Sequence, residues 1–290
     1  LSYMTFIDKL IAQIDLVQPI VNLMLDNSSI FFDEYKQRIN PRLIVVGFSK
    51  HRYSRKDEKN QIKARQEFDK FYNNFELLLD KATPNNLKKI DKAKTNIINL
   101  IEQTKVPVNI ESGKNNFLKY TKVFKEFLEL LQDEETATMI IPDTNSIIQY
   151  PDPISYKNIA NSSEFDFVIL PTVLSELDKL KISHRNEDFR KKVKSVIKRL
   201  KGYRKQGDVL KGVTVNKTVT LKMIATEPNF EKTLNWLDPN NNDDRIIANA
   251  LELQINKPSN NLIFVSSDMN FQNKAQLANL TIFDTDDLNS

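Results

Sequence analysis

The stretch MIIPDTN, residues 139–145, decides the fold of the C-terminal half of this 290-residue chain. It is a short apolar run that leads directly into a carboxylate, as a buried strand does when it ends at a polar site. Similar apolar runs occur at 167–170, 262–265 and 281–283, and amphipathic segments lie between them. Buried strands that alternate with helices predict a parallel sheet covered on both faces, so we expect an α/β domain.

The two halves of the chain follow different patterns. Before an acidic stretch at 132–136, apolar residues recur at three- and four-residue spacing, which predicts helices, and the run 43–48 could be a strand or a buried turn. We therefore predict a mostly α-helical N-terminal domain over residues 1–135 and the α/β domain over residues 136–290. The predicted helices of the first half cover 6–21, 56–79, 87–101 and 115–131, and those of the second half cover 172–181, 188–204 and 244–253.

The composition excludes several classes of protein. Forty percent hydrophobic and 28% charged residues fit a folded soluble chain, and no run reaches the roughly 18 apolar residues that a membrane span needs. The absence of cysteine removes disulfides, thiolate nucleophiles and cysteine-bound zinc, and fits a cytoplasmic protein. With only His51 and His184, a histidine-rich metal site or a Ser-His-Asp triad is not expected. Catalysis in this chain would depend mainly on carboxylates.

Carboxylates occupy each position that follows a predicted strand or begins a helix. Asp143 and Asp268 follow strands, Glu176 lies in the helix after the second strand, and Asp243 and Asp244 begin a later helix. Singly, each has an ordinary explanation, because Asp is a good helix N-cap and an exposed Glu pairs with lysines. Together they would repel one another at one sheet edge unless a hard cation neutralised them. Mg²⁺ or Mn²⁺ suits such a site, and the chemistry that it supports is phosphodiester hydrolysis.

The order and surroundings of these acids resemble those of a PIN-domain nuclease. The resemblance rests on 143–145, 174–177, 244–248 and 267–271, and it covers about 150 residues. It implies a PIN-like Rossmannoid three-layer domain with a central parallel sheet. Within the family, the chain looks closest to the PIN module of phosphate-starvation-type ATPase proteins, which share a basic helix and a β-rich insertion, here 211–225.

The resemblance also implies a set of site residues. Asp244 is preferred over Asp243 because it stands four residues before Ala248, as in the helix of the family. The residues expected to bind Mg²⁺ or Mn²⁺ and to act in catalysis are Asp143, Glu176, Asp244 and Asp268. The residues expected to make secondary polar contacts are Asn145, Asp243 and Ser266.

A basic block follows the Glu176 helix. Residues 179–211 hold 13 basic and 3 acidic residues, a net charge of +10, whereas the rest of the chain sums to −6. The block could be a solvated helix face, but its place beside the acidic edge favours contact with the phosphates of a nucleic acid. The candidates for this contact are Lys179, Lys181, Arg185, Arg190, Lys191 and Lys194.

The acids predict a metal-dependent nuclease. The resemblance to the PIN family implies an endoribonuclease that hydrolyses single-stranded RNA, with a role as a toxin, in RNA decay or in defence. Two alternatives remain open, a structure-specific DNA nuclease of the flap type and a non-catalytic PIN-fold binding module. The helical N-terminal domain carries no recognisable motif. It could position RNA, form a homo-oligomer or bind an inhibitory partner, and no membrane partner is expected.

Overall fold

The computed structural model describes residues 4–33, 50–133 and 136–289. The chain divides into two compact units, one formed by residues 10–130 and the other by residues 131–290 together with the residues up to Lys9. The possible strand at 43–48 lies outside the described residues, as does residue 135 at the predicted boundary. In the described ranges, no helix is long and apolar enough to cross a membrane.

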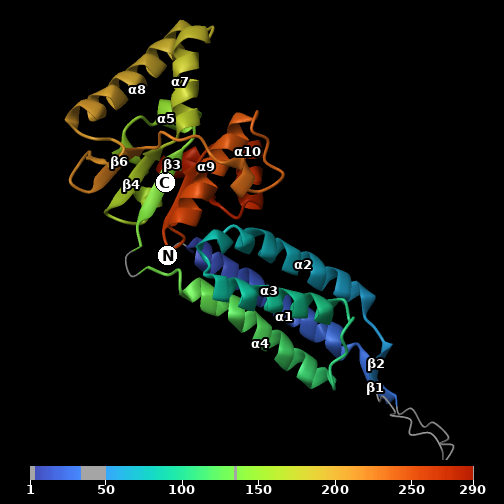
Figure 1. Ribbon diagram of the computed structural model, residues 1–290. Helices are drawn as coiled ribbons and strands as arrows, with labels where there is room; N and C mark the ends of the chain where they lie inside the picture. Colours follow the sequence, from blue (N-terminus) through green and yellow to red (C-terminus); the bar gives the residue numbers. More distant parts are fainter. Residues whose placement is uncertain (1–3, 34–49, 134–135, 290) are drawn as a thin grey trace, which may run out of the picture. The chain divides into compact units, whose positions relative to one another are not determined.

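The first unit is built mainly of helices (Figure 1). Thr83 caps α3 by accepting a hydrogen bond from the amide of Asn86, and Pro84 occupies the first turn, where its missing N–H costs nothing. Asn109 and Ser112 form a reciprocal capping box at the start of α4. The helices are α1 (Phe6–Asp26), α2 (Glu58–Glu76), α3 (Pro84–Ile101) and α4 (Ile110–Glu129), with a 3₁₀ turn, η1 (Leu79–Lys81), after α2.

Aromatic rings form the core of this unit. Phe68, Phe71 and Phe75 recur at three- and four-residue spacing along α2, so all three point to the same side of the helix. Their ring centroids lie 6.2, 5.5 and 5.0 Å from that of Phe124 in α4, and all four side chains are fully buried. Edge-to-face and tilted packing of this kind stabilises the contact of α2 with α4 beyond simple burial.

A β-hairpin in the first unit was not predicted. β1 (Ser29–Asp33) pairs antiparallel with β2 (Lys50–Arg55). The sequence of β2 is KHRYSR, which lacks the apolar alternation of a half-buried strand. The strand depends on backbone pairing with β1, which the local pattern does not reveal.

The second unit contains a six-stranded sheet whose strands follow the order β5-β6-β4-β3-β7-β8. All neighbouring pairs are parallel except β5 with β6. The four predicted strands are present, and β6, from the region expected to be a β-rich insertion, joins the main sheet beside β4. The strands are β3 (Thr138–Pro142), β4 (Phe165–Ile169), β5 (Val213–Thr214), β6 (Val219–Met223), β7 (Asn261–Val265) and β8 (Thr281–Phe283).

Helices flank this sheet, so the predicted α/β architecture with a mostly parallel sheet is confirmed (Figure 1). The longest are α7 (Pro171–Ser183), α8 (Glu187–Gln206) and α9 (Asn242–Asn256). The shorter helical elements are α5 (Thr144–Gln149), η2 (Pro153–Tyr156), α6 (Lys157–Ala160), η3 (Phe230–Lys232), α10 (Met269–Leu277) and η4 (Thr285–Asn289).

The topology of the sheet brings distant segments to one edge. From β3 the chain passes to β4 and β6 on one side, and it later returns to β7 on the other side of β3. In open parallel sheets a ligand binds at the carboxyl ends of the strands, at the point where the strand order reverses. Here that point is the carboxyl end of β3, which is followed directly by Asp143.

Candidate active site

Asp143 lies at the reversal point of the sheet and caps α5. Its Oδ1 accepts a hydrogen bond of 2.6 Å from the amide of Ser146. Its own amide donates to the carbonyl of Val265 at the end of β7, 3.0 Å away, and the Ser146 hydroxyl donates to the same carbonyl. Only 7% of Asp143 is exposed. The carboxylate is therefore held in one orientation between β3 and β7.

Ser266 connects two of the acids that follow strands. Its hydroxyl donates to Oδ2 of Asp143 at 2.5 Å and accepts from the amide of Asp268 at 3.0 Å. Ser266 is fully buried and does not line the pocket, so it holds the Asp143 carboxylate in place from the protein interior. The prediction of a secondary polar role for this serine agrees with these contacts, although the role itself remains a prediction.

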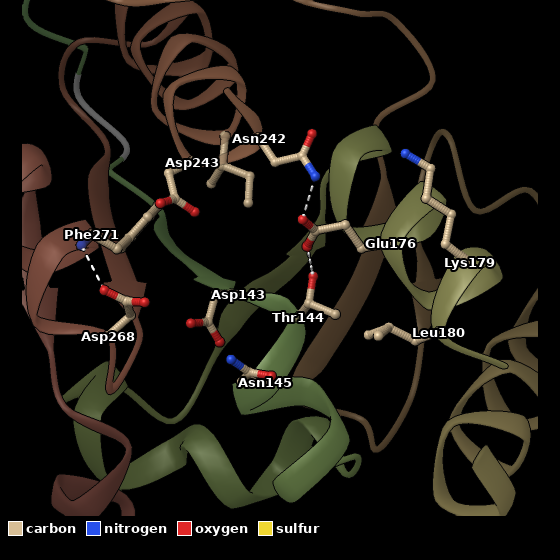
Figure 2. Close-up of a pocket in the computed structure, with 11 residues that line it drawn as sticks. Asp143, Thr144, Asn145, Glu176, Lys179, Leu180, Asn242, Asp243, Asp268 and Phe271 are labelled. Atoms are coloured by element: carbon tan, nitrogen blue, oxygen red, sulfur yellow. Dashed lines mark hydrogen bonds between the residues drawn. The ribbon is translucent and has the colours of Figure 1, made fainter. Parts of the chain in front are cut away.

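Glu176 is fixed by two residues that the sequence analysis did not assign to the site. Thr144, the first residue of α5, donates its hydroxyl to Oε2 of Glu176, and Asn242, the first residue of α9, donates its amide to Oε1 at 2.7 Å. Figure 2 shows the carboxylate held between these two donors. Thr144 directly follows Asp143, and Asn242 ends a run of three asparagines, but neither signal shows that the two side chains converge on α7.

Asp268 and Asp243 come from the first turns of two further helices. Asp268 caps α10, and its Oδ1 accepts from the amides of Asn270 at 2.8 Å and Phe271 at 3.0 Å. Asp243 lies in the first turn of α9, and its side chain points into the pocket (Figure 2). The two helix starts therefore direct a carboxylate toward the edge where Asp143 lies.

Asp244 does not lie where the resemblance placed it. It is 4% exposed, its Oδ1 lies 2.6 Å from Nζ of Lys274, and its Oδ2 accepts from the amide of Asp238 at 2.9 Å. The pocket is lined by Asp243 and not by Asp244. Adjacent residues of a helix project about 100° apart, and here Asp243 lines the pocket whereas Asp244 pairs with Lys274.

These side chains surround one pocket of about 340 Å³ (Figure 2). Of the predicted site residues it contains three of the four metal-binding acids, two of the secondary polar residues and one basic residue. Ser266 lies behind Asp143 and Asp244 lies beside Lys274, as described above. The lining residues are Asp143, Thr144, Asn145, Glu176, Lys179, Leu180, Asn242, Asp243, Ile246, Asp268 and Phe271.

Burial raises the pKa of Asp143 above its ordinary value of 3.8. Hydrogen bonds from Ser146 and Ser266 act in the opposite direction, and the negative charge of Glu176 adds to the increase. Removal from water dominates, so the ionised form of this carboxyl is disfavoured in the metal-free protein.

The pKa of Asp243 is also raised, first by burial and next by the negative charge of Asp268. Glu176 and Asp244 raise it further, whereas the cation of Lys274 lowers it. The pocket thus concentrates negative charge that the protein only partly neutralises.

The chemistry of this donor set fits a hard divalent cation. All the candidate donors are carboxylate oxygens, which Mg²⁺ and Mn²⁺ prefer. A bound cation would offset both the burial and the neighbouring negative charges that raise the pKa of Asp143 and Asp243. Across the described ranges, no three acidic or histidine side chains are grouped closely enough to hold an ion as they stand.

The six predicted phosphate-binding residues have different surroundings. Lys179 lines the pocket, and Lys181 forms an ion pair with Asp178. Arg190 donates to the carbonyl of His184 at 2.6 Å, so its guanidinium is engaged at the turn between α7 and α8. The remaining three are exposed on that turn or on α8: Arg185, Lys191 and Lys194.

Comparison with known proteins assigns the family. A family model described as PIN domain matches residues 140–286, about half of the chain and most of the second unit. This match does not extend to the closer resemblance with phosphate-starvation-type ATPase proteins, which stays a prediction. No curated protein matches the chain. PIN domains are usually nucleases and typically bind divalent metal ions. With the parallel sheet, the strand-end acids and this match in agreement, the chain belongs to the PIN-domain family.

Proposed function

We propose that the protein is a metal-dependent endoribonuclease that hydrolyses phosphodiester bonds of single-stranded RNA. The observation that carries the proposal is the convergence of Asp143, Glu176, Asp243 and Asp268 on one pocket at the carboxyl edge of the sheet. These four acids come from four separate elements. If each only capped or decorated its own helix, nothing would require the four to meet in one pocket. The raised pKa of Asp143 supports a site that is completed by a cation.

The residues that would hold Mg²⁺ or Mn²⁺ are these four acids, with Asp243 in place of Asp244. A bound ion of this kind activates water and stabilises the negative charge that develops on the phosphate, and the products carry 5′-phosphate and 3′-hydroxyl ends. The carboxylates must be ionised to bind it. Ser266 supports this state at Asp143 through the hydrogen bond to Oδ2.

Other residues of the chain orient the donors and the substrate. Thr144 and Asn242 occupy both oxygens of Glu176 and fix the direction of its remaining lone pairs. Lys179 lines the pocket and is exposed on α7, where its cation is suited to bind a phosphate that flanks the scissile bond. The contact is with the backbone, so it would position the strand without reading its sequence.

The choice of RNA rests on the resemblance to the PIN family. A flap-type DNA nuclease is the second candidate because the carboxylate chemistry is the same on either backbone. A non-catalytic binding module is less well supported, since the pocket retains a full set of acids. An inhibitory partner or self-association through the helical unit remains part of the proposal.

A cleavage assay tests the proposal. The full chain is incubated with an end-labelled unstructured RNA, a DNA of the same sequence and a flap DNA, each with Mn²⁺, Mg²⁺ or EDTA. We expect metal-dependent cutting of the RNA that is strongly reduced by Asp143→Asn and by Asp243→Asn. Asp91→Asn, on the exposed surface of α3, should leave it unchanged. Preferred cutting of the flap would support the DNA nuclease instead. A folded chain that cuts none of the three would contradict both.

A further inference from the structure

Helix α8 carries a row of lysines on the side that faces away from the protein. Val193, Val196 and Leu200 are the buried residues of this helix. The lysines recur at alternating three- and four-residue steps, which places them on the opposite side of the helix from the buried residues. The last four lysines of the helix, here called the lysine stripe, are Lys194, Lys198, Lys201 and Lys205, and all are exposed.

The charges of the lysine stripe are not balanced by neighbours. Lys191, one step before the stripe, pairs with Glu187 at 3.4 Å and Asp188 at 3.3 Å in the first turn of α8. Beyond that turn the helix contains no acidic residue. In the part of the chain that the structure describes, no ion pair reaches any lysine of the stripe.

A row of like charges at this spacing destabilises a helix, because side chains three and four residues apart are neighbours. A polyanion laid along the row would remove this repulsion. From Lys194 to Lys205 the stripe extends about 17 Å at about 1.5 Å per residue, long enough to follow several phosphates of one strand.

We infer that the lysine stripe binds the phosphate backbone of the single-stranded nucleic acid that the nuclease pocket cuts, an inference that rests on the proposed function. The stripe goes beyond the six basic residues predicted from the sequence, with which it shares only Lys194. Lysine donates hydrogen bonds and carries a compact charge, and the stripe contains no aromatic ring for base stacking. The contact is therefore with phosphates and is independent of sequence.

A membrane surface fits the stripe less well. Helices that bind in the membrane interface combine a basic face with an exposed apolar face that enters the lipid. The apolar face of α8, formed by Val193, Val196 and Leu200, is already buried in the fold. α8 also packs against α7, the helix that supplies Glu176 to the pocket, so the stripe belongs to the same unit as the proposed site (Figure 1).

The test measures binding without cleavage. A fluorescein-labelled, unstructured 20-nucleotide RNA is titrated with the full chain in EDTA at several KCl concentrations, and fluorescence anisotropy gives the slope of log K against log[KCl]. The stripe variant is Lys198→Gln, Lys201→Gln and Lys205→Gln, since Gln keeps the helix propensity. The control with the same change of charge is Lys88→Gln, Lys89→Gln and Lys92→Gln, all exposed on α3.

The slope is negative, and we expect its magnitude to be smaller by about 2 in the stripe variant, because each lost phosphate contact on a single strand contributes about 0.7. The slope of the control is expected to stay at the wild-type value. Equal slopes for the two variants, with thermal melts showing both folded, would overturn the inference. The inference would also be overturned if the stripe bound vesicles of phosphatidylcholine and phosphatidylserine while the slope for RNA stayed unchanged in the stripe variant.

The result separates the two proposals. If the chain binds RNA through the stripe but cuts no substrate in Mn²⁺, the proposed nuclease activity is contradicted and the stripe stands as a binding surface. If the chain cuts RNA but the salt dependence of RNA binding is unchanged in the stripe variant, the proposed activity is supported and the role of the stripe in binding is rejected.

Discussion

Nζ of Lys274 in α10 lies 2.6 Å from Oδ1 of Asp244 in α9, and the adjacent Asp243 lines the pocket. Asp244 is 6% exposed at its side chain and Lys274 is 23% exposed, so the pair is largely shielded from solvent. Asp244 is paired with Lys274, and Asp243 is the aspartate of the first turn of α9 that lines the pocket.

The two aspartates are therefore expected to respond differently to the same substitution. Asp243→Asn should slow metal-dependent RNA cutting by about 100-fold or more, as does the removal of one group that stabilises transition-state charge. Asp244→Asn should retain more activity and instead lower the free energy of unfolding by about 1–3 kcal/mol, because Lys274 loses its charged partner. Cleavage rates and urea denaturation of both variants check this. The reverse pattern would assign the catalytic role to Asp244.

Asp143→Asn is expected to raise the melting temperature of the metal-free protein at neutral pH. The folded-state pKa of Asp143 is raised, so its protonated form stabilises the fold. That contribution is complete below the ordinary pKa of 3.8 and is lost as the pH rises through the raised value. Asn carries no charge, so it does not have the cost of an ionised carboxyl that is buried at neutral pH. Thermal melts in EDTA from about pH 4 to about pH 8 should show a gap between variant and wild type that closes toward the acidic end.

Added Mn²⁺ should change this order. The wild type gains stability when the ion binds the folded state only, whereas Asp143→Asn should gain little. If Mn²⁺ raises the melting temperature of both proteins equally, the binding of the ion does not depend on Asp143.

Loss of the Asn242 amide should weaken metal binding without removing any acid. Asn242→Ala frees Oε1 of Glu176, and groups that orient a metal-binding carboxylate typically contribute about 10-fold or more to metal affinity or activity. Asn240→Ala is the matched control, because the side-chain amide of Asn240 donates to Asp238 and Asn240 does not line the pocket. A titration of cleavage rate against Mn²⁺ concentration distinguishes them. Equal Mn²⁺ dependence would show that Asn242 does not orient Glu176.

Two glycines offer a test of the fold that is independent of activity. Gly212 has a φ of +121°, and an added Cβ would lie 2.6 Å from Cγ2 of Thr220, so Gly212→Ala should destabilise the protein by about 2 kcal/mol. Gly202 lies inside α8 with no atom near its missing Cβ, so Gly202→Ala should stabilise it by about 0.5–1 kcal/mol. The urea midpoints should move in opposite directions. Similar midpoints would contradict the backbone conformation at Gly212.

Much of the second unit could be predicted from the sequence because its signals are local. The apolar runs at 139–141 and 262–265 are continuous, as buried parallel strands require, and both became strands of the sheet. The amphipathic segment 188–204 became α8, within two residues at its C-terminal end. Each of these elements is specified by neighbours in the chain.

The features that could not be predicted depend on contacts between distant residues. The spacing to Ala248 favoured Asp244, but that side chain pairs with Lys274, which lies 30 residues further along the chain, and Asp243 lines the pocket. In the same way, Thr144 and Asn242 meet Glu176 only in the folded sheet. The positions of the acids could be predicted from local spacing. The hydrogen-bond and ion-pair partners that orient their side chains come from other elements.

The order of the strands has a consequence for the synthesis of the protein. The pocket takes Asp143 from the start of the sheet and Asp268 from a segment made near the end, and β7 must insert beside β3 before the two can meet. A chain that is still emerging from the ribosome therefore has Asp143 and Glu176 but no complete pocket. The pocket is therefore completed only after Asp268 has been synthesised and β7 has paired with β3.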